Sequence, residues 1–468
     1  MKIYIIFGLI ITHTLLSKNL ILHDYDNPST SHILDAEIQD DLLIVSGTIG
    51  GIEFYDISNP EILNNLYNLQ LSGGGSGGGI KPNCIVASGN YAYVTTNQGL
   101  GVINISNPSN PQYLGIVTET NNYILENLDV YDNFLAVAAH EDGVLFYDIS
   151  DPSEPEHIYT LNTVNAWAVQ MEPFEHINYE FVIYIADQNS IYTLAYMYYN
   201  DHHDFAPIDN IFLSSEIATY KDIAFGDGLV YFAKGSDGVD VYQTSGSMSF
   251  DGYTFNCDMH VPCYLDTYNT SVMANRIATF DNKLAVSDWD DVEILEWNGY
   301  ELELVGYKNT TRRTMAIATK GNYIYSAEWA SVQIFEYGEV EGADIDLDTY
   351  ELNYPYVENG NSYTLSLGVT NNGNQSLNVI DAYTTNSEFS YTSLNNLGSN
   401  ESQIVEITYT ADSQNASGSY RIYSDDPDEN EIICETNGNI DGANVGEQAP
   451  NFNLPIIANG NGSFQLSD

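Results

Sequence analysis

Apolar and polar positions alternate with a period of two in many short segments between residues 30 and 340. Segments such as 42–46, 91–95 and 134–138 are rich in β-branched and aromatic residues. Gly, Asn, Asp and Pro separate these segments about every ten positions, and helical periodicity is nearly absent. Because half-buried β-strands produce this pattern, the sequence predicts an all-β chain.

One unit of this pattern is repeated along the chain. Three clear copies each contain two alternating strands around a tight turn, followed by an Ile-Ser-Asn/Asp-Pro ending at Pro60, Pro108 and Pro152. Four weaker copies follow and begin at Val182, Leu229, Lys283 and Tyr323. Four strands in roughly 40–50 residues is the repeat length of a propeller blade. Residues 18–338 are therefore predicted to form a seven-bladed β-propeller.

The Asp-Ile-Ser-Asn-Pro element has a structural interpretation. Asp and Ser can cap backbone donors where the third strand of a unit ends, and Pro prevents further ladder bonding. The repeats resemble the LVIVD-repeat family, whose units carry a Leu/Val-Ile-Val-Asp-Ile-Ser-Asn-Pro core. This resemblance implies a β-propeller on an exported or surface protein, and it provides no common catalytic residues.

The seventh copy has three strand segments, at 314–319, 323–327 and 331–337, and no fourth segment before the linker. Residues 19–25 resemble the fourth strand of the other copies. We expect this N-terminal segment to pair with the last blade, because closing the ring removes two exposed strand edges.

A second region follows a short acidic linker at residues 339–343. Residues 344–441 contain strand patterns near 345–352, 362–370, 376–383, 403–410 and 418–423, which is the size and spacing of a β-sandwich. The stretch from Leu367 to Val379 resembles the Thr-Asn-x-Gly-Asn core of the Hydin/ASPM-like and choice-of-anchor D immunoglobulin-like domains. That resemblance implies a spacer or interaction module.

The last segment, residues 442–468, is predicted to be a short C-terminal tail. Its residues Val445–Leu454 and Phe464–Asp468 resemble the beginning of a redoxin domain of the peroxiredoxin/TlpA type. The resemblance implies that a reactive Cys follows. Because that Cys is missing before Asp468, we expect a truncated redoxin domain. The alternative is a Gly- and Asn-rich tail with a chance match.

The N-terminus predicts export. A single Lys is followed by an apolar stretch from Ile3 to Ile11 and a polar stretch up to Ser17, as in a secretory signal peptide over residues 1–17. A buried first strand is the alternative. No later run is long enough to span a membrane. We therefore expect an extracellular, cell-surface or periplasmic protein.

Charge narrows the possible partners. The chain has 12 Lys and Arg against 65 Asp and Glu, a net charge of −53. Nucleic acids and anionic lipids need a basic surface, so both are excluded as main partners. A protein or carbohydrate ligand remains, and we expect a monomer. We predict no cofactor and no metal ion.

The two closely spaced cysteines, Cys257 and Cys263, are predicted to form a disulfide that closes a loop. A metal site formed with His260, and perhaps with His202 and His203, is the alternative. The loop at residues 73–79 consists of Gly and Ser and is interpreted as flexible.

Three acidic clusters could bind calcium, and they lie at residues 288–293, 344–348 and 424–429. None has the spacing of a known calcium loop, so solvent-facing acidic surfaces are the favoured interpretation. Trp167, Trp289 and Trp329 could contact a sugar or peptide at the channel mouth or could fill the core.

We find no complete catalytic site in the sequence. The main hypothesis is an exported, non-enzymatic scaffold that presents a propeller surface to a protein or glycan. The alternative is the N-terminal part of an extracytoplasmic thiol–disulfide or peroxide-reducing enzyme whose redoxin domain is cut off after Asp468. A hydrolytic propeller is a third possibility and needs acids or His residues that converge at the channel.

Overall fold

The computed structural model describes residues 20–28, 30–71, 79–120, 123–173, 180–188, 190–199, 202–212, 220–250, 253–259, 261–338, 342–412, 416–427, 430–438, 453–455 and 463–465. The chain divides into two compact units, Met1–Gly338 and Glu339–Asp468. In the described part of the chain the only helical element is a 3-10 turn at Thr118–Thr120. The prediction of an all-β chain is confirmed.

Five four-stranded antiparallel sheets follow one another in the first unit, each in simple chain order. Sheet 1 contains β2 (Ser31–Gln39), β3 (Leu42–Ile49), β4 (Gly51–Asp56) and β5 (Asn64–Leu69). Sheet 2 contains β6 (Pro82–Ser88), β7 (Tyr91–Thr96), β8 (Gly99–Asn104) and β9 (Gln112–Ile116). Sheet 3 contains β10 (Leu128–Tyr131), β11 (Phe134–Ala138), β12 (Val144–Asp148) and β13 (Glu156–Leu161). Sheet 4 contains β14 (Ala166–Pro173), β15 (Phe181–Asp187), β16 (Ser190–Tyr199) and β17 (His202–Phe212). Sheet 5 contains β18 (Asp222–Gly226), β19 (Leu229–Ala233), β20 (Val239–Gln243) and β23 (Cys263–Tyr268), with a hairpin of β21 (Ser247–Phe250) and β22 (Tyr253–Asn256) between its last two strands.

The remaining sheet of this unit has six strands in the order β1-β28-β27-β26-β25-β24. Its strands are β1 (Leu20–Asp26), β24 (Arg276–Phe280), β25 (Lys283–Trp297), β26 (Leu302–Lys320), β27 (Tyr323–Glu328) and β28 (Ser331–Tyr337). The long strands change partner along their length. β25 pairs with β24 up to Ser287 and with β26 from Trp289, while β26 pairs with β27 from Thr314. The division of β25 and of β26 into two parts gives the sheet two successive runs of four segments.

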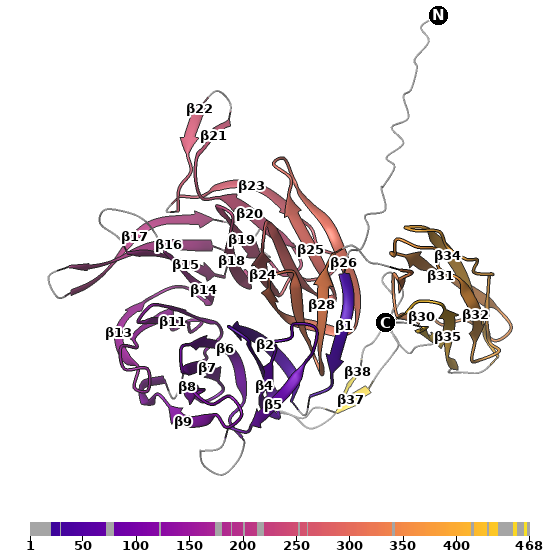
Figure 1. Ribbon diagram of the computed structural model, residues 1–468, viewed down its shortest axis with the longest axis horizontal. Coiled ribbons are helices and arrows are strands. Elements are labelled where there is room, and N and C mark those ends of the chain that lie inside the picture. Colours follow the sequence, from indigo (N-terminus) through magenta and orange to yellow (C-terminus); the bar gives the residue numbers. More distant parts are fainter. Residues whose placement is uncertain are drawn as a thin grey trace, which may run out of the picture. The chain divides into compact units, whose positions relative to one another are not determined.

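The first strand of each of the five sheets and the first strand of each of these two runs together form a closed ring. We call these seven strands the first strands. β2 contacts β6, β6 contacts β10, and the contacts continue through β14, β18, β24 and β26 back to β2. Figure 1 shows the sheets following one another around this ring, with the indigo strand β1 beside the orange strand β28.

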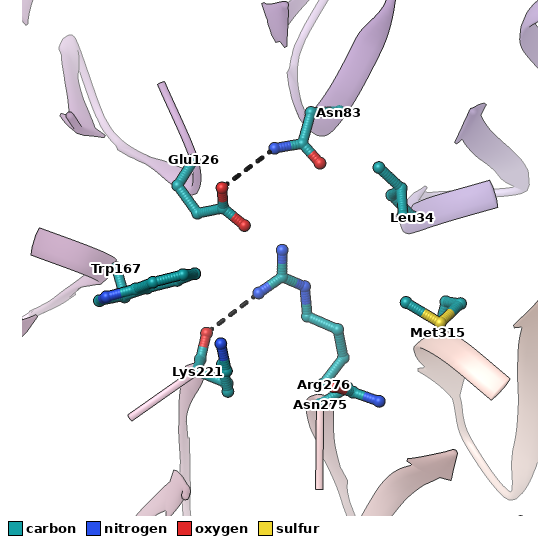
Figure 2. Close-up of a pocket in the computed structure, with 8 residues that line it drawn as sticks. All are labelled: Leu34, Asn83, Glu126, Trp167, Lys221, Asn275, Arg276 and Met315. Carbon is teal, nitrogen blue, oxygen red and sulfur yellow. Dashed lines mark hydrogen bonds between the residues drawn. The ribbon is translucent and has the colours of Figure 1, made fainter. Parts of the chain in front are cut away.

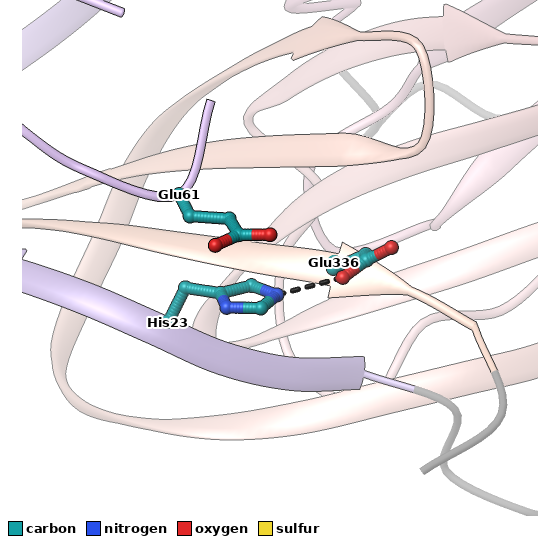
Figure 3. Close-up of side chains that lie close together, drawn as sticks. All are labelled: His23, Glu61 and Glu336. Atoms are coloured by element: carbon teal, nitrogen blue, oxygen red, sulfur yellow. Dashed lines mark hydrogen bonds and ion pairs between the residues drawn. The ribbon is translucent and has the colours of Figure 1, made fainter. Parts of the chain in front are cut away.

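The predicted closing strand is confirmed. β1 pairs antiparallel with β28, from Leu20 opposite Tyr337 to Asp26 opposite Val332. His23 of β1 hydrogen-bonds to Glu336 of β28 at 2.7 Å (Figure 3). Leu20 is fully buried. The N-terminal strand thus completes the last sheet with backbone pairing and with an apolar anchor.

Period-two alternation sends successive side chains of one strand to two different interfaces. In β3, Leu43 and Val45 pack with residues of β26, β27 and β28, while Leu42 and Ile44 pack with residues of sheet 2. Because both faces of the strand are buried, its sequence is a continuous apolar run. The same sharing of cores between neighbouring sheets recurs around the ring.

The repeated Asp-Ile-Ser-Asn-Pro element acts as predicted. The carboxylate of Asp56 accepts the backbone N–H of Ser58 at 2.9 Å, and Asp148 accepts that of Ser150 at 2.7 Å. The element also joins neighbouring sheets, because the carbonyl of Pro152 accepts the hydroxyl of Tyr93 at 3.0 Å. The recurrence of this element in the three clear copies therefore has a structural cause.

The second unit contains two four-stranded sheets around one hydrophobic core. One sheet contains β29 (Ile345–Leu347), β31 (Ser362–Asn371), β34 (Ser402–Thr410) and β33 (Phe389–Tyr391). The other contains β30 (Glu351–Asn353), β36 (Glu431–Gly438), β35 (Ala416–Ser424) and β32 (Val379–Thr384). The prediction of one strand over 345–352 is wrong, because the chain crosses there between the sheets. β33 and β36 were not predicted.

The predicted solvent exposure of the acidic cluster at 344–348 is wrong for two of its members. Asp344 is 2% exposed and Asp346 is fully buried. Asp346 accepts the backbone N–H of Leu347 at 2.8 Å and the hydroxyl of Tyr350 at 3.1 Å. Asp426, from the third acidic cluster, is also buried and accepts the backbone N–H of Ile345 at 2.7 Å. Hydrogen bonds to the protein replace water around these carboxylates.

The predicted signal peptide, residues 1–17, lies outside the described residues, as do most of the Gly-rich loop and most of residues 442–468. Two described strands in that last segment, β37 (Asn453–Pro455) and β38 (Ser463–Gln465), pair antiparallel. Within the described residues, no helix has the length and apolar character needed to cross a membrane.

Candidate functional site

A pocket of about 350 Å³ lies where the seven first strands of the ring begin. Figure 2 shows the side chains that surround it. They are half-buried and come from every first strand or from the residues just before it: Leu34, Asn83, Glu126, Trp167, Lys221, Asn275, Arg276 and Met315. We call this site the mouth pocket.

The repeat places these side chains at one level of the ring. Each pocket position lies at the start of a repeated first strand or just before it, and the side chain differs from one repeat to the next. Cationic, anionic, amide, aromatic and aliphatic groups therefore meet in one place. The apolar residues that follow in each first strand pack in the core and hold the backbone in place. The residues that differ between repeats set the chemistry of the pocket.

Arg276 lies at the base of the mouth pocket. Its guanidinium donates to the backbone carbonyl of Lys221 at 3.0 Å and to the sulfur of Cys84 at 2.7 Å, and its Nε lies 3.7 Å from Asp35. Burial raises the pKa of the Cys84 thiol well above its usual value. Cys84 is therefore a protonated, buried hydrogen-bond partner and lacks the thiolate that nucleophilic chemistry requires.

An aromatic and cationic wall forms one side of the pocket. The ammonium of Lys221 lies 3.8 Å from the centre of the Trp167 ring, within the range of a cation–π interaction. His140 packs edge-on against the same ring, with 4.7 Å between the ring centroids. Burial lowers the pKa of Lys221. Trp167 is the one predicted Trp that the structure places in this pocket.

Glu126 faces Arg276 across the pocket. Its carboxylate lies 3.3 Å from His140 Nε2 and accepts Asn83 Nδ2 at 3.4 Å. Burial alone would raise the pKa of Glu126, but the hydrogen bond from His140 and the charge of Arg276 together lower it. The same hydrogen bond raises the pKa of His140. The pocket thus combines two cations with one carboxylate.

A second cavity of about 270 Å³ continues along the first strands and is lined by largely buried acids that were not predicted from the sequence. Each acid accepts a backbone N–H of the next first strand: Asp35 from Ile85 at 2.8 Å, Glu37 from Ala87 at 3.2 Å, Asp129 from Met171 at 2.6 Å and Asp222 from Ile277 at 3.0 Å. We call these four residues the inner acids. An acidic residue inside the first apolar segment of a repeat is the signal that could have revealed them.

Burial is the largest cause of the raised pKa values of the inner acids. It raises the pKa of Asp35 to about 6, that of Asp129 to about 7 and that of Glu37 to about 8. Their unfolded values lie near 4. At pH values between the unfolded and the folded pKa of an inner acid, the folded chain binds more protons than the unfolded chain. The stability of the folded chain therefore falls as the pH rises through this range.

We therefore expect the first unit to be more stable against urea at pH 5 than at pH 8. The difference is on the order of 1.4 kcal/mol for each pH unit that lies between pH 5 and the raised pKa of one acid. Glu37→Gln keeps an oxygen for the N–H of Ala87 and removes the charge, so it should raise the urea midpoint at pH 8 and flatten the pH dependence. Equal stability of the wild type at both pH values would contradict this prediction.

The other predicted site residues lie elsewhere in the structure. Cys257 and Cys263 form a disulfide. His260 lies outside the described residues, and only the backbone of His202 is described. His203 is exposed on β17, and its Nδ1 lies 2.9 Å from the hydroxyl of Tyr196. These positions do not assemble a metal site in the described part of the chain.

Trp289 and Trp329 contact Arg313. Its guanidinium lies 4.6 Å from the ring centre of Trp289 and 5.7 Å from that of Trp329. The acidic cluster around Trp289 is largely buried, so its predicted solvent exposure is wrong for Asp288, Asp291 and Glu293.

Figure 3 shows another group of possible metal ligands, formed by His23, Glu61 and Glu336. His23 already hydrogen-bonds to Glu336, and Glu61 is exposed. The His23–Glu336 pair therefore connects β1 to β28.

The mouth pocket can bind an anionic group. None of its eight lining residues is a Ser, Thr, Cys or Tyr nucleophile. Arg276, Lys221 and the amides of Asn83 and Asn275 supply hydrogen-bond donors, and Trp167 supplies an aromatic face. Two of the chain's 12 basic residues meet here in a protein with a net charge of −53. Carboxylates and similar anions fit this donor set.

One of the comparisons with known proteins, the match to a family model, agrees with a repeat architecture. The family model described as LVIVD repeat matches residues 82–119 and 125–163. Each matched segment spans one complete sheet, sheet 2 in the first case and sheet 3 in the second. No curated protein matches the chain. Among solved structures, the computationally designed Ika8 protein is 12% identical over 66% of this chain and 98% of its own, with a TM-score of 0.44. The chain thus contains two LVIVD repeats in residues 82–163, consistent with a repeat β-propeller.

Proposed function

We propose that the chain is an exported scaffold whose first unit is a seven-bladed β-propeller that binds a protein or glycan ligand. The closed ring of first strands supports seven blades, because the six-stranded sheet contributes two runs of four segments. The LVIVD matches support the propeller. Residues 1–17 support export, with the character of a signal peptide.

The mouth pocket is the observation that carries this function. Every repeat contributes at least one side chain to it, and the contributed groups suit recognition rather than bond breaking. We propose that Arg276 and Lys221 bind a carboxylate of the ligand while Trp167 packs against its apolar or sugar-ring surface. Glu126 accepts hydrogen bonds from neighbouring hydroxyl or amide groups of the ligand. Acidic peptides and uronic-acid oligosaccharides both offer such a carboxylate.

The second unit is proposed to be an immunoglobulin-like spacer. Its two four-stranded sheets share one core, and Leu367–Val379 carries the motif that resembles immunoglobulin-like domains. Such a unit would hold the binding module away from its point of attachment.

The binding prediction can be tested with arrays of acidic peptides and of uronic-acid oligosaccharides, probed with the full chain. Lys221→Met and Trp167→Ala should weaken binding of the best probe about tenfold or more, because each removes a direct contact. Lys283→Met is the matched control, since it removes one positive charge at the other end of β24. Equal loss in the control would assign the effect to overall charge, and no loss in either pocket variant would contradict the site.

A second candidate function rests on residues 445–454, which resemble the beginning of a redoxin domain. In that case the propeller would be an accessory to thiol chemistry performed further along the chain. The two functions differ in one observation: a Cys or Cys-x-x-Cys encoded soon after Asp468 favours the redoxin function.

A further inference from the structure

Four acidic side chains meet where β25 changes its partner from β24 to β26. Trp289 has a φ of 58° at this point, and the strand register shifts between Trp289 and Asp291. This irregularity interrupts the alternation of side chains. Asp288, Asp290 and Asp291 consequently place carboxylate oxygens within 4.8 Å of one another.

Ser271, in the loop between β23 and β24, contacts all three aspartates. Its hydroxyl donates to Asp288 Oδ2 at 2.7 Å and lies 3.5 Å from Asp290 Oδ1 and from Asp291 Oδ2. The backbone N–H of Val272 also donates to Asp288 Oδ2, at 2.8 Å. The loop that connects sheet 5 to β24 is therefore tied to this cluster.

Two oxygens of the cluster are buried and have no hydrogen-bond partner. Asp288 is fully buried and its Oδ1 is unsatisfied, while Glu293 is 3% exposed and its Oε2 is unsatisfied. A buried carboxylate oxygen without a partner is costly, so native proteins rarely leave one. These oxygens indicate a ligand that the protein itself does not supply.

Several carboxylates lie close together at this position. In the described part of the chain, no Lys, Arg or His forms an ion pair with Asp288, Asp290 or Glu293. Burial, followed by the charge of Asp288, raises the pKa of Glu293 to about 8.

We propose that Asp288, Asp290 and Asp291, with Glu293 beside them, bind a calcium ion. Calcium takes six to eight oxygen ligands and tolerates irregular geometry, whereas zinc prefers nitrogen and sulfur and magnesium requires a strict octahedron. Asp290 is exposed and gives the ion a route from solvent. The bound ion would join the β25 irregularity to the Ser271 loop, and hence sheet 5 to the next run of strands.

The test is calcium titration of the full chain after treatment with EDTA, by calorimetry and by thermal unfolding. We expect one saturable site, with a Kd of ~10⁻³ M or tighter as in extracellular modules, and a higher unfolding midpoint with calcium. Terbium should bind in the same place and show luminescence sensitised by Trp289. Asp288→Asn should weaken binding about tenfold or more.

Asp290→Asn keeps the test decisive if Asp288→Asn fails to fold, because Asp290 is exposed. Asp290→Asn should also weaken calcium binding. Glu141→Gln, an exposed acid in the turn of sheet 3, is the matched control and should bind like the wild type. Wild type without saturable calcium binding would overturn the proposal. So would calcium binding that neither aspartate variant changes, or magnesium binding of equal strength. If mild acid stabilises the chain where calcium does not, and Glu293→Gln abolishes that effect, the cluster holds a proton instead of calcium and the proposal is overturned.

Discussion

A chain that begins at Asn27 is expected to unfold at a temperature roughly 5–10 °C lower than a chain that begins at Asn19. The shorter chain lacks β1. It loses the pairing of Leu20–Asp26 with β28 and the burial of Leu20 among Phe280, Ile324 and Phe335. Loss of a buried Leu side chain alone costs about 2–5 kcal/mol.

β1 also connects the last sheet to sheet 1. The hydroxyl of Tyr55 donates to Asp26 at 2.9 Å, and the backbone N–H of Leu63 donates to Asp24 at 2.9 Å. Without β1 the ring keeps its inner contact between β26 and β2 but loses these outer connections, and the edge of β28 becomes open to pairing with other chains.

Scanning calorimetry and light scattering measure both consequences. The chain that begins at Asn19 is the matched control, because it also lacks the N-terminal residues but retains the closing strand. Equal unfolding temperatures for the two chains would show that the first unit does not depend on β1. Stronger self-association of the shorter chain at equal concentration would support the open edge.

Arg276→Met is expected to lower the free energy of unfolding of the first unit by about 3–5 kcal/mol at pH 8, because it leaves buried carboxylates without their cation. Arg276 is mostly buried, and its charge lowers the pKa values of Asp35 and Asp222 against the opposing effect of burial. Met occupies a similar volume, so lost packing contributes little.

The loss should be smaller at pH 5 than at pH 8. Without Arg276 the pKa values of Asp35 and Asp222 rise further, so the folded variant retains protons up to a higher pH. The stability of the variant therefore falls more steeply than that of the wild type as the pH rises. Urea unfolding at the two pH values measures this difference.

Arg421→Met provides the matched control. Arg421 pairs with Glu431 at 2.6 Å in the second unit, and both side chains are 31% exposed. Exposed pairs of this kind contribute about 0–1 kcal/mol. A loss for Arg276→Met as small as for the control, or one that is independent of pH, would contradict a buried network around Arg276.

The interactions that the sequence predicted correctly are local. The strands of sheets 1, 2 and 3 follow from alternation and turn residues, and the role of Asp56 and Asp148 follows from hydrogen bonds that span two residues. The closing strand was also predictable, because a missing fourth strand in one repeat matched a spare strand at the N-terminus.

The interpretation of the acidic residues failed where burial depends on distant segments. Asp346 belongs to a strand that alternation alone places at the surface, yet the fold covers it, and Ile345 beside it is held by Asp426 some eighty positions away. Asp288 is buried because the Ser271 loop covers it. Solvent exposure of a strand residue is a property of the packing around the strand, so the alternation pattern could not reveal it.

The sequence by itself determined the all-β class, the repeated unit and the strand that closes the ring, because each depends on neighbouring residues or on repetition. Only the tertiary structure decided that Asn83, Glu126, Lys221 and Arg276 meet in one pocket. These residues come from four different repeats and lie far apart along the chain. The ring brings them together because it sets equivalent positions of successive repeats at one level, and the charge of each then acts on the others over a few ångströms.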